Sequence, residues 1–158
     1  MAKEKKSKGA FQELRNKKAF HNYIIEDKYE AGIVLTGTEV KSIRAGKAQI
    51  TEAFVRVENG DAILYHAHID EYKFGNVNNH NPLRPRKLLL HKAQINKLQS
   101  AIDAGGCTVV PLRLYFKGAL VKVEIAVGKG KKLHDKRDSI KKKEASREAE
   151  RAMKFRRK

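Results

Sequence analysis

Hydrophobic and polar residues alternate in short segments through the middle of the chain, which is the pattern of half-buried β-strands. The segments with this pattern are 23–25, 33–35, 53–58, 62–69, 108–116 and 119–127. Asn59 and Gly60 join the third and fourth segments, and an Asn-Gly dipeptide favours the tight type I′ turn of a β-hairpin. Charged residues 26–28 between the first two segments, and Lys117-Gly118 between the last two, predict two further hairpins.

Two other segments have the signals of short helices. Thr36 and Glu39 have the spacing of a capping box, and Gly46 stands where the helix that begins there would end. A second helix is predicted after residues 87–91, because hydrophobic residues recur there at helical spacing until the chain reaches Gly-Gly at 105–106.

Six short strands and two helices in a body of about 110 residues predict a mainly β fold. A small antiparallel barrel of the oligonucleotide-binding type, with about six strands and two or more short helices, fits this pattern. A two-layer α+β sandwich also fits, and the pattern alone does not separate the two. Residues 72–86 are rich in Asn, Pro and Gly and are predicted to form a long exposed loop.

Composition divides the chain into three segments. Residues 1–15 are predicted to be a flexible basic arm, residues 16–128 the folded barrel, and residues 129–158 a basic tail. The tail has helix-forming composition, but its apolar stripe is mostly alanine and is too thin to offset the entropy lost on ordering. We therefore expect the tail to be disordered alone and to fold into a helix of roughly 30 Å against a partner.

Positive charge is concentrated at the two ends of the chain. The net charge is +17, of which residues 1–20 carry +5, residues 129–158 carry +9 and the body between them only +3. Basic ends on a nearly balanced body indicate a polyanionic partner whose counterions are released on binding. Nucleic acid is favoured over an anionic membrane surface, because the tail lacks the wide apolar face of an interfacial helix.

The sequence offers few candidates for catalysis or metal binding. Cys107 is the only cysteine, which excludes an internal disulfide and a cysteine-rich zinc site. His66 and His68 could share one strand face, but no third ligand stands near them. Nucleophile motifs and paired carboxylates are also lacking, so we predict no enzyme, no metal site and no cofactor. The first residues lack the apolar run of a signal peptide, which predicts a cytoplasmic protein.

A glycine- and lysine-rich segment, residues 127–138, marks the junction of the barrel and the tail. It lacks the spacing of a P-loop, and a run of lysines taken alone is just as typical of a solvated turn. His134 stands among these bases, and an imidazole can stack on a nucleobase while neighbouring cations hold phosphates. The junction is therefore predicted to take part in recognising RNA.

With these features assembled, the chain resembles the small protein B (SmpB) family, the tmRNA-binding proteins of bacterial trans-translation. The similarity runs from Asn16 to the end of the chain. The matching segments are NKK (16–18), YEAG (29–32), GTEVKSIRAGK (37–47), RKLLLH (86–91) and GKKLHDKR (130–137). The resemblance implies an oligonucleotide-binding-type barrel with a C-terminal tail.

The resemblance also implies a function and the residues that carry it. The family binds the tRNA-like domain of tmRNA and delivers alanyl-tmRNA, with elongation factor Tu, to ribosomes stalled on truncated mRNA. The residues expected to bind tmRNA are Asn16, Lys17, His21, Glu30, Arg44, Leu90, His91 and Lys122. Contacts with the ribosomal decoding centre and the vacant mRNA channel are expected from Gly130, Lys131, Lys132, His134, Asp135, Lys136, Arg137, Ile140, Met153 and Lys154.

Two other classes of RNA-binding protein have similarly basic chains. A structural ribosomal protein would occur in every subunit, whereas a rescue factor would be scarce and would co-purify with one structured RNA. A single-strand binder of the cold-shock type is disfavoured, since aromatic residues are sparse in the predicted strands and the chain has no tryptophan.

Overall fold

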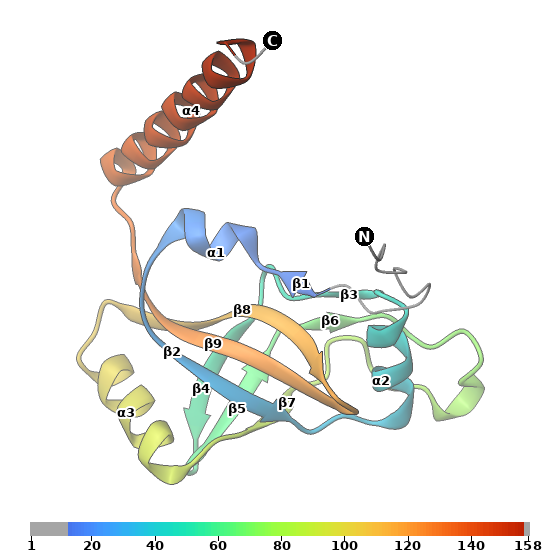
Figure 1. The fold of residues 1–158 in the computed structure, drawn as a ribbon. Helices are drawn as coiled ribbons and strands as arrows, with labels where there is room; N and C mark the ends of the chain where they lie inside the picture. Colours follow the sequence, from blue (N-terminus) through green and yellow to red (C-terminus); the bar gives the residue numbers. More distant parts are fainter. Residues whose placement is uncertain (1–12, 157–158) are drawn as a thin grey trace.

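The computed structural model describes residues 13–156, with the backbone alone for residues 76 and 133–135. Residues 1–12 and 157–158, which hold most of the predicted arm and the last residues of the predicted tail, lie outside the described residues. The elements in chain order (Figure 1) are β1 Leu14–Arg15, α1 Lys17–Asn22, β2 Tyr23–Ile33, α2 Gly37–Arg44, β3 Ala48–Gln49, β4 Phe54–Glu58, β5 Asp61–Tyr65, β6 His68–Ile69, the 3-10 turn η1 Asn76–Asn78, β7 Arg86–Leu89, α3 Lys92–Asp103, β8 Cys107–Lys117, β9 Leu120–Gly130 and α4 Leu133–Arg156.

Six of these strands close into an antiparallel barrel. Around the ring, β8 pairs with β4, β4 with β5, β5 with β7, β7 with β2, β2 with β9, and β9 again with β8. Closure pairs both sides of every ring strand, which protects a small β-protein from pairing with other chains. The predicted mainly β barrel is therefore confirmed over the two-layer sandwich. Strand β1 pairs with β8 outside the ring, so residues 14–15 of the predicted arm belong to the fold.

Strand β2 stands where a hairpin was predicted. The hydrophobic runs on either side of charged residues 26–28 are the two halves of this one strand. Both halves pair with β9, starting with Tyr23 opposite Gly130, and the register shifts between Ile25 and Lys28. Such a bulge leaves the charged side chains exposed without reversing the chain, so the hairpin prediction is wrong.

Strand β7 was not predicted, and the predicted strand over residues 62–69 is divided. The buried positions of β7 are Arg86 and Leu88. Because one of them is an arginine, β7 lacks the alternation of hydrophobic and polar residues from which a strand is predicted. Strand β5 ends at Tyr65, since His66 has a positive φ of 59°, and β6 continues beyond it. The ring thus has the predicted number of strands, with β2 counted once and β7 added.

The local turn and cap signals are confirmed. Asn59 and Gly60 have φ values of 50° and 78°, as the type I′ turn requires. The Thr36 hydroxyl accepts from the Glu39 backbone and the Glu39 carboxylate accepts from the Thr36 backbone, which completes the capping box of α2. Helix α2 ends before Gly46, whose φ is 76°. Helix α3 and the β8–β9 hairpin also occupy the predicted segments.

The core fills the barrel, and a second cluster anchors α1 on its outside. The valine and isoleucine side chains of β9 are all buried. Ala126, on the other side of β9, is also fully buried because α1 covers the barrel there. Ala19 of α1, Val110 and Leu112 complete this cluster, so α1 is fixed on β8 and β9.

A buried ion pair fastens α2 to the segment that precedes and begins β7. Glu39 and Arg86 are both fully buried, and Glu39 Oε1 lies 3.0 Å from Arg86 Nε. Arg84 donates to both carboxylate oxygens of Glu39 at 3.0 and 2.9 Å. Arg86 also donates to the backbone carbonyls of Ala67 and Pro82. The network therefore connects α2, the end of the long loop and the segment between β5 and β6.

The network also fixes the charge state of Glu39. Burial alone would raise the pKa of this carboxyl, because it disfavours the charged form. Hydrogen bonds from Arg84 and the Thr36 backbone, and the charge of Arg86, outweigh that effect and hold the pKa below its ordinary value. Glu39 is therefore a buried carboxylate with its charge fully compensated.

The predicted loop over residues 72–86 is partly buried, although its composition indicated an exposed loop. His80 is buried, and its ring nitrogens lie 2.9 Å from the Thr38 hydroxyl and 2.9 Å from the Ile69 carbonyl. Phe74 and Val77 are the most exposed hydrophobic residues before it. The loop is thus exposed at its tip and anchored at its base.

Strand β9 continues beyond the predicted barrel boundary at residue 128 and ends at Gly130. A side chain at position 128 would place its Cβ 2.9 Å from the Cβ of Tyr23, so this close pairing of β9 with β2 requires Gly128. Helix α4 follows and projects away from the barrel (Figure 1). Nearly all of its described side chains are exposed. Packing therefore contributes little to the stability of this helix. Its disorder in the free protein stays a prediction.

Candidate nucleic-acid interface

Charged and aromatic side chains cover the outer side of β2, β9 and β8. This group is termed the strand surface and consists of Glu30, Arg113, Tyr115, Lys117, Lys122 and Glu124. Tyr115 lies opposite Lys122 in the ladder, and Glu30 opposite Glu124. The Tyr115 hydroxyl and the Lys117 ammonium both donate to the Glu30 carboxylate. The fold thus brings together Glu30 and Lys122, two of the predicted RNA-binding residues.

The strand surface presents a fixed acceptor between cations. Hydrogen bonds from Tyr115 and Lys117 lower the pKa of Glu30, and the charge of Lys122 adds to this effect. Burial, with the hydrogen bond to Glu30, raises the pKa of Tyr115 to about 12, so the hydroxyl remains a donor at neutral pH. A carboxylate held in this way can accept a hydrogen bond from a base amino group or a ribose 2′-hydroxyl, while the lysines contact phosphates.

Arg113, Tyr115 and Lys117 were not among the predicted site residues. The Arg113 guanidinium lies 4.6 Å from the centre of the Tyr115 ring and forms ion pairs with Glu13 and Glu124. The signal that could have found them was the alternation of β8, which places every second residue on the same side of the sheet. Only the hydrophobic side of that alternation entered the prediction.

Arg44, Leu90 and His91 lie on elements next to the strand surface. Arg44 ends α2, and its guanidinium lies 5.5 Å from the centre of the Phe116 ring, close to the β8–β9 turn. Leu90 and His91 follow β7, which runs antiparallel to β2. Leu90 is half-buried against the core and His91 is exposed. These three predicted residues therefore border two sides of the strand surface.

The remaining predicted tmRNA-binding residues belong to α1. Lys17 and His21 are exposed, but Asn16 is only 2% exposed. Its side-chain oxygen accepts from the Ala19 backbone, and its amide nitrogen donates to two backbone carbonyls. Asn16 therefore positions α1 from inside the protein. Helix α1 lies near Gly130, at the other end of β9 from the β8–β9 turn, so the predicted residues form two separate groups.

The predicted decoding-centre residues run from the end of β9 into α4. Gly130 ends β9, and Lys131 Nζ donates to the Phe20 carbonyl and to the Ser139 hydroxyl at 3.1 Å each. Lys132 and Arg137 are exposed, and Lys136 is half-buried. The side chains of His134 and Asp135 lie outside the described ones. Farther along α4, the exposed residues of this group are Ile140, Met153 and Lys154. Lys131 therefore connects α1 to the beginning of α4.

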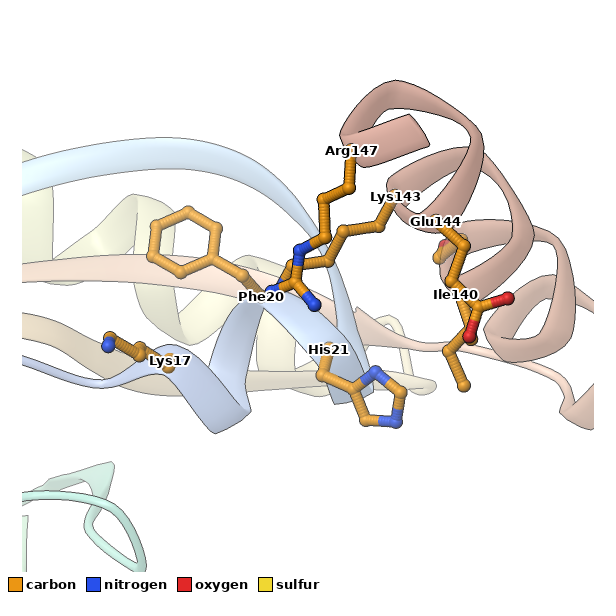
Figure 2. A pocket seen from close by; sticks show the side chains of 8 residues that line it. Lys17, Phe20, His21, Ile140, Lys143, Glu144 and Arg147 are labelled. Atoms are coloured by element: carbon orange, nitrogen blue, oxygen red, sulfur yellow. The ribbon is translucent and has the colours of Figure 1, made fainter. Parts of the chain in front are cut away.

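A cleft of about 330 Å³ lies between α1 and the first half of α4 (Figure 2). The residues that line it are Lys17, Phe20, His21, Ser139, Ile140, Lys143, Glu144 and Arg147. Phe20 and Ile140 are 48% and 45% exposed, which makes part of the lining apolar. Figure 2 shows Lys143 and Arg147 reaching from α4 toward Phe20. Two predicted tmRNA-binding residues, Lys17 and His21, thus share a cleft with the tail.

Two other features are absent from the part of the chain that the structure describes. None of its helices has the length and hydrophobicity that a membrane span needs. Nor do three or more His, Cys, Asp or Glu side chains gather there in a group that could hold a metal ion.

Similarity to known proteins identifies the family. The family model described as SmpB protein matches residues 13–155. The chain belongs to the SmpB family. An SsrA-binding protein of Geotalea uraniireducens is 59% identical over 141 residues, which cover 89% of this chain and 93% of the relative. Another, from Shouchella clausii, is 56% identical over 142 residues, which cover 90% of this chain and 91% of the relative.

A solved structure agrees with this assignment. It carries the description "tmRNA-SmpB: a journey to the center of the bacterial ribosome", and one of its chains is 44% identical to this chain with a TM-score of 0.66. The match covers 77% of this chain and 85% of that one. The resemblance stated from sequence motifs is therefore confirmed, and membership of the SmpB family agrees with the prediction that the chain is not an enzyme.

Proposed function

We propose that this protein binds the tRNA-like domain of tmRNA and delivers alanyl-tmRNA, together with elongation factor Tu, to ribosomes stalled on truncated mRNA. The observation that carries the proposal is the similarity to SsrA-binding proteins over 89% and 90% of the chain. The separation of a nearly neutral body from basic ends supports it, since the body recognises one RNA while the ends bind polyanions generally. The protein would act in the cytoplasm, where the ribosomes are.

The spacing of the two groups of RNA-binding residues favours a folded RNA as the ligand. The strand surface and α1 lie toward opposite ends of β9, which has 11 residues. Lys122 and Gly130 are eight residues apart, about 26 Å at about 3.3 Å per residue, a span that a rigid RNA helix can bridge. A flexible single strand would need stacking groups along the way. The tRNA-like domain of tmRNA supplies a rigid body of that kind.

The tail is proposed to detect the absence of mRNA. Residues 130–137 would contact the decoding centre, with His134 stacked on an rRNA base. Helix α4, including Ile140, Met153 and Lys154, would lie in the mRNA channel beyond it. An intact mRNA fills that channel and excludes the tail sterically. A vacant channel presents rRNA phosphates, and a segment with a charge of +9 can fold against them.

RNA that co-purifies with the protein tests the proposal directly. The protein purified from its own cells is expected to carry tmRNA in far greater proportion than the tmRNA share of total RNA. Stoichiometric association with every small subunit would instead identify a structural ribosomal protein. Purified protein that shows no preference for tmRNA would contradict the proposal.

The substitution Arg44→Ala is expected to weaken binding of the tRNA-like RNA by about 1–3 kcal/mol, because it removes an exposed cation from the rim of the strand surface. Arg56→Ala is the matched control. Arg56 is also exposed and also lies over aromatic rings, those of Phe54 and Tyr65, but on β4. Fluorescence anisotropy with a labelled transcript measures both affinities. Equal affinities for wild type and Arg44→Ala would remove Arg44 from the interface.

The substitution His134→Ala is expected to separate the two halves of the function. Binding of the tRNA-like RNA should stay within about twofold of wild type, since residue 134 lies beyond the barrel. The rate at which the tmRNA-encoded tag is added to stalled nascent chains should fall at least tenfold, which corresponds to the free energy of one base–aromatic stack. The two assays use the same preparation. Parallel loss of binding and tagging would contradict the proposed division of labour.

A further inference from the structure

The cleft between α1 and α4 has the chemistry of a nucleotide site. Its apolar surface comes from Phe20, which offers an aromatic face, and from Ile140 on the opposite helix. Exposed apolar side chains on facing elements indicate a ligand when they line a bounded cavity. The volume of about 330 Å³ is at the small end of the range for ligand sites, roughly 300–1,000 Å³. A single nucleotide suits this volume, whereas an RNA helix does not.

The charges around the cleft select an anion. Lys17 comes from α1, and Lys143 and Arg147 come from α4, while Glu144 is the one acid in the lining. Figure 2 shows the Lys143 and Arg147 side chains reaching from α4 toward Phe20. Cations beside an aromatic ring are the arrangement by which proteins hold unpaired nucleotides, with the base stacked and the phosphate paired.

We propose that this cleft holds one unpaired nucleotide of the RNA that the barrel binds. The base packs against Phe20 and Ile140, and the adjoining phosphate pairs with Lys143 and Arg147. The inference rests on the proposed function, because Lys17 and His21 of the cleft belong to the face assigned to the tRNA-like RNA. It adds to that function a contact between this RNA and the tail.

Such a nucleotide would join the two helices that line the cleft. Lys131 already connects them, through Nζ hydrogen bonds to the Phe20 carbonyl and the Ser139 hydroxyl. These bonds are exposed or only partly buried and therefore hold α4 weakly. A nucleotide with contacts on both helices fixes the direction of α4 before the complex meets the ribosome. The first half of α4 is then ordered by tmRNA, and the second half only by the channel.

Two double variants with the same loss of charge test the cleft. Lys143→Ala/Arg147→Ala removes two cations that line it, and Lys142→Ala/Arg151→Ala removes two cations of the same helix that do not. The first is expected to bind a transcript of the tRNA-like domain about tenfold more weakly than the second, as one lost phosphate-and-stacking contact implies. Equal affinities of the two variants would overturn the proposal, and so would tight binding of an acidic peptide that the RNA does not displace.

A second pair of variants tests the stacking. Phe20→Leu keeps an apolar side chain of similar size on α1 but removes the aromatic face, and Phe155→Leu makes the same change at the far end of α4. About tenfold weaker RNA binding is expected for Phe20→Leu and no change for Phe155→Leu. If wild type itself fails to bind the transcript, the proposed function is wrong. If wild type binds and both phenylalanine variants match it, the cleft proposal alone is wrong.

Hydrogen exchange tests the ordering of α4. Addition of the transcript to wild-type protein is expected to slow amide exchange at residues 139–147 and to leave residues 150–156 unchanged. The Lys143→Ala/Arg147→Ala variant should lose this protection even when saturated with RNA. Protection that reaches both halves equally, or neither half, would contradict a nucleotide bound between α1 and the first half of α4.

Discussion

Replacing Glu39 with alanine is expected to lower the free energy of unfolding by about 3–5 kcal/mol, the usual cost of removing one partner from a buried ion pair. The substitution leaves the Arg86 guanidinium fully buried without a counter-charge, and it releases Arg84 and the N-terminal cap of α2. Unfolding in urea measures the loss. The matched control is Glu52→Ala, which breaks the exposed pair with Lys18 and should cost less than about 1 kcal/mol. A loss of less than about 1 kcal/mol for Glu39→Ala as well would show that the ion-pair network contributes little to the free energy of unfolding.

The stabilisation by Glu39 should depend on pH with a definite sign. The folded pKa of this carboxyl is lowered, so its contribution is complete above the pKa of the unfolded chain. The contribution is lost as pH falls through the lower folded pKa. The difference in unfolding free energy between wild type and Glu39→Ala should therefore be constant near neutral pH and shrink in acid. A difference that grows on acidification would contradict the assigned charge state.

Removing residues 139–158 is expected to abolish tagging of stalled nascent chains and to leave the barrel as stable as before. Helix α4 has nearly all of its described side chains exposed and packs on the body near α1, so Tm should change by less than about 2 °C. The shortened protein should still bind the tRNA-like RNA, with the affinity of Lys143→Ala/Arg147→Ala. Differential scanning fluorimetry, a binding titration and a reconstituted tagging reaction give the three quantities.

Either of two outcomes would contradict the role assigned to the tail. A fall in Tm of several degrees would mean that α4 is an integral part of the fold, so that its ordering could not depend on the ribosome. Undiminished tagging by the shortened protein would mean that the channel is detected by some other part of the complex. The first outcome concerns the fold and the second the function, so each can occur alone.

The barrel could be predicted because its signals are local. Asn59-Gly60, the Thr36–Glu39 capping box and the alternation of β9 each depend on residues adjacent in the chain. The errors arose where a distant partner decides the structure. Residues 23–33 form one strand because β9 pairs along all of it, and β7 is concealed because its buried Arg86 is compensated by Glu39. Neither the pairing of β2 with β9 nor the ion pair of Arg86 with Glu39 can be recognised from residues adjacent in the chain.

The candidate interface could be predicted in part for the same reason. The family resemblance implied Glu30, Arg44 and Lys122, and the fold places all three around one end of the barrel. The motifs did not show that Asn16 is buried, which follows from its bonds to segments far along the chain. Tyr115 and the α1–α4 cleft were missed because their chemistry exists only after β8 meets β2 and α4 meets α1.

The rate of tag addition as a function of mRNA length tests the central claim most directly. Ribosomes stalled with an mRNA that ends in the P site are compared with ribosomes whose mRNA extends through the channel, each supplied with alanyl-tmRNA, elongation factor Tu and this protein. Rapid tagging is expected on the truncated message and slow tagging on the extended one, and removal of residues 139–158 should abolish the rapid reaction. Equal rates of tagging by the full-length protein on the two messages would contradict a tail that detects a vacant channel.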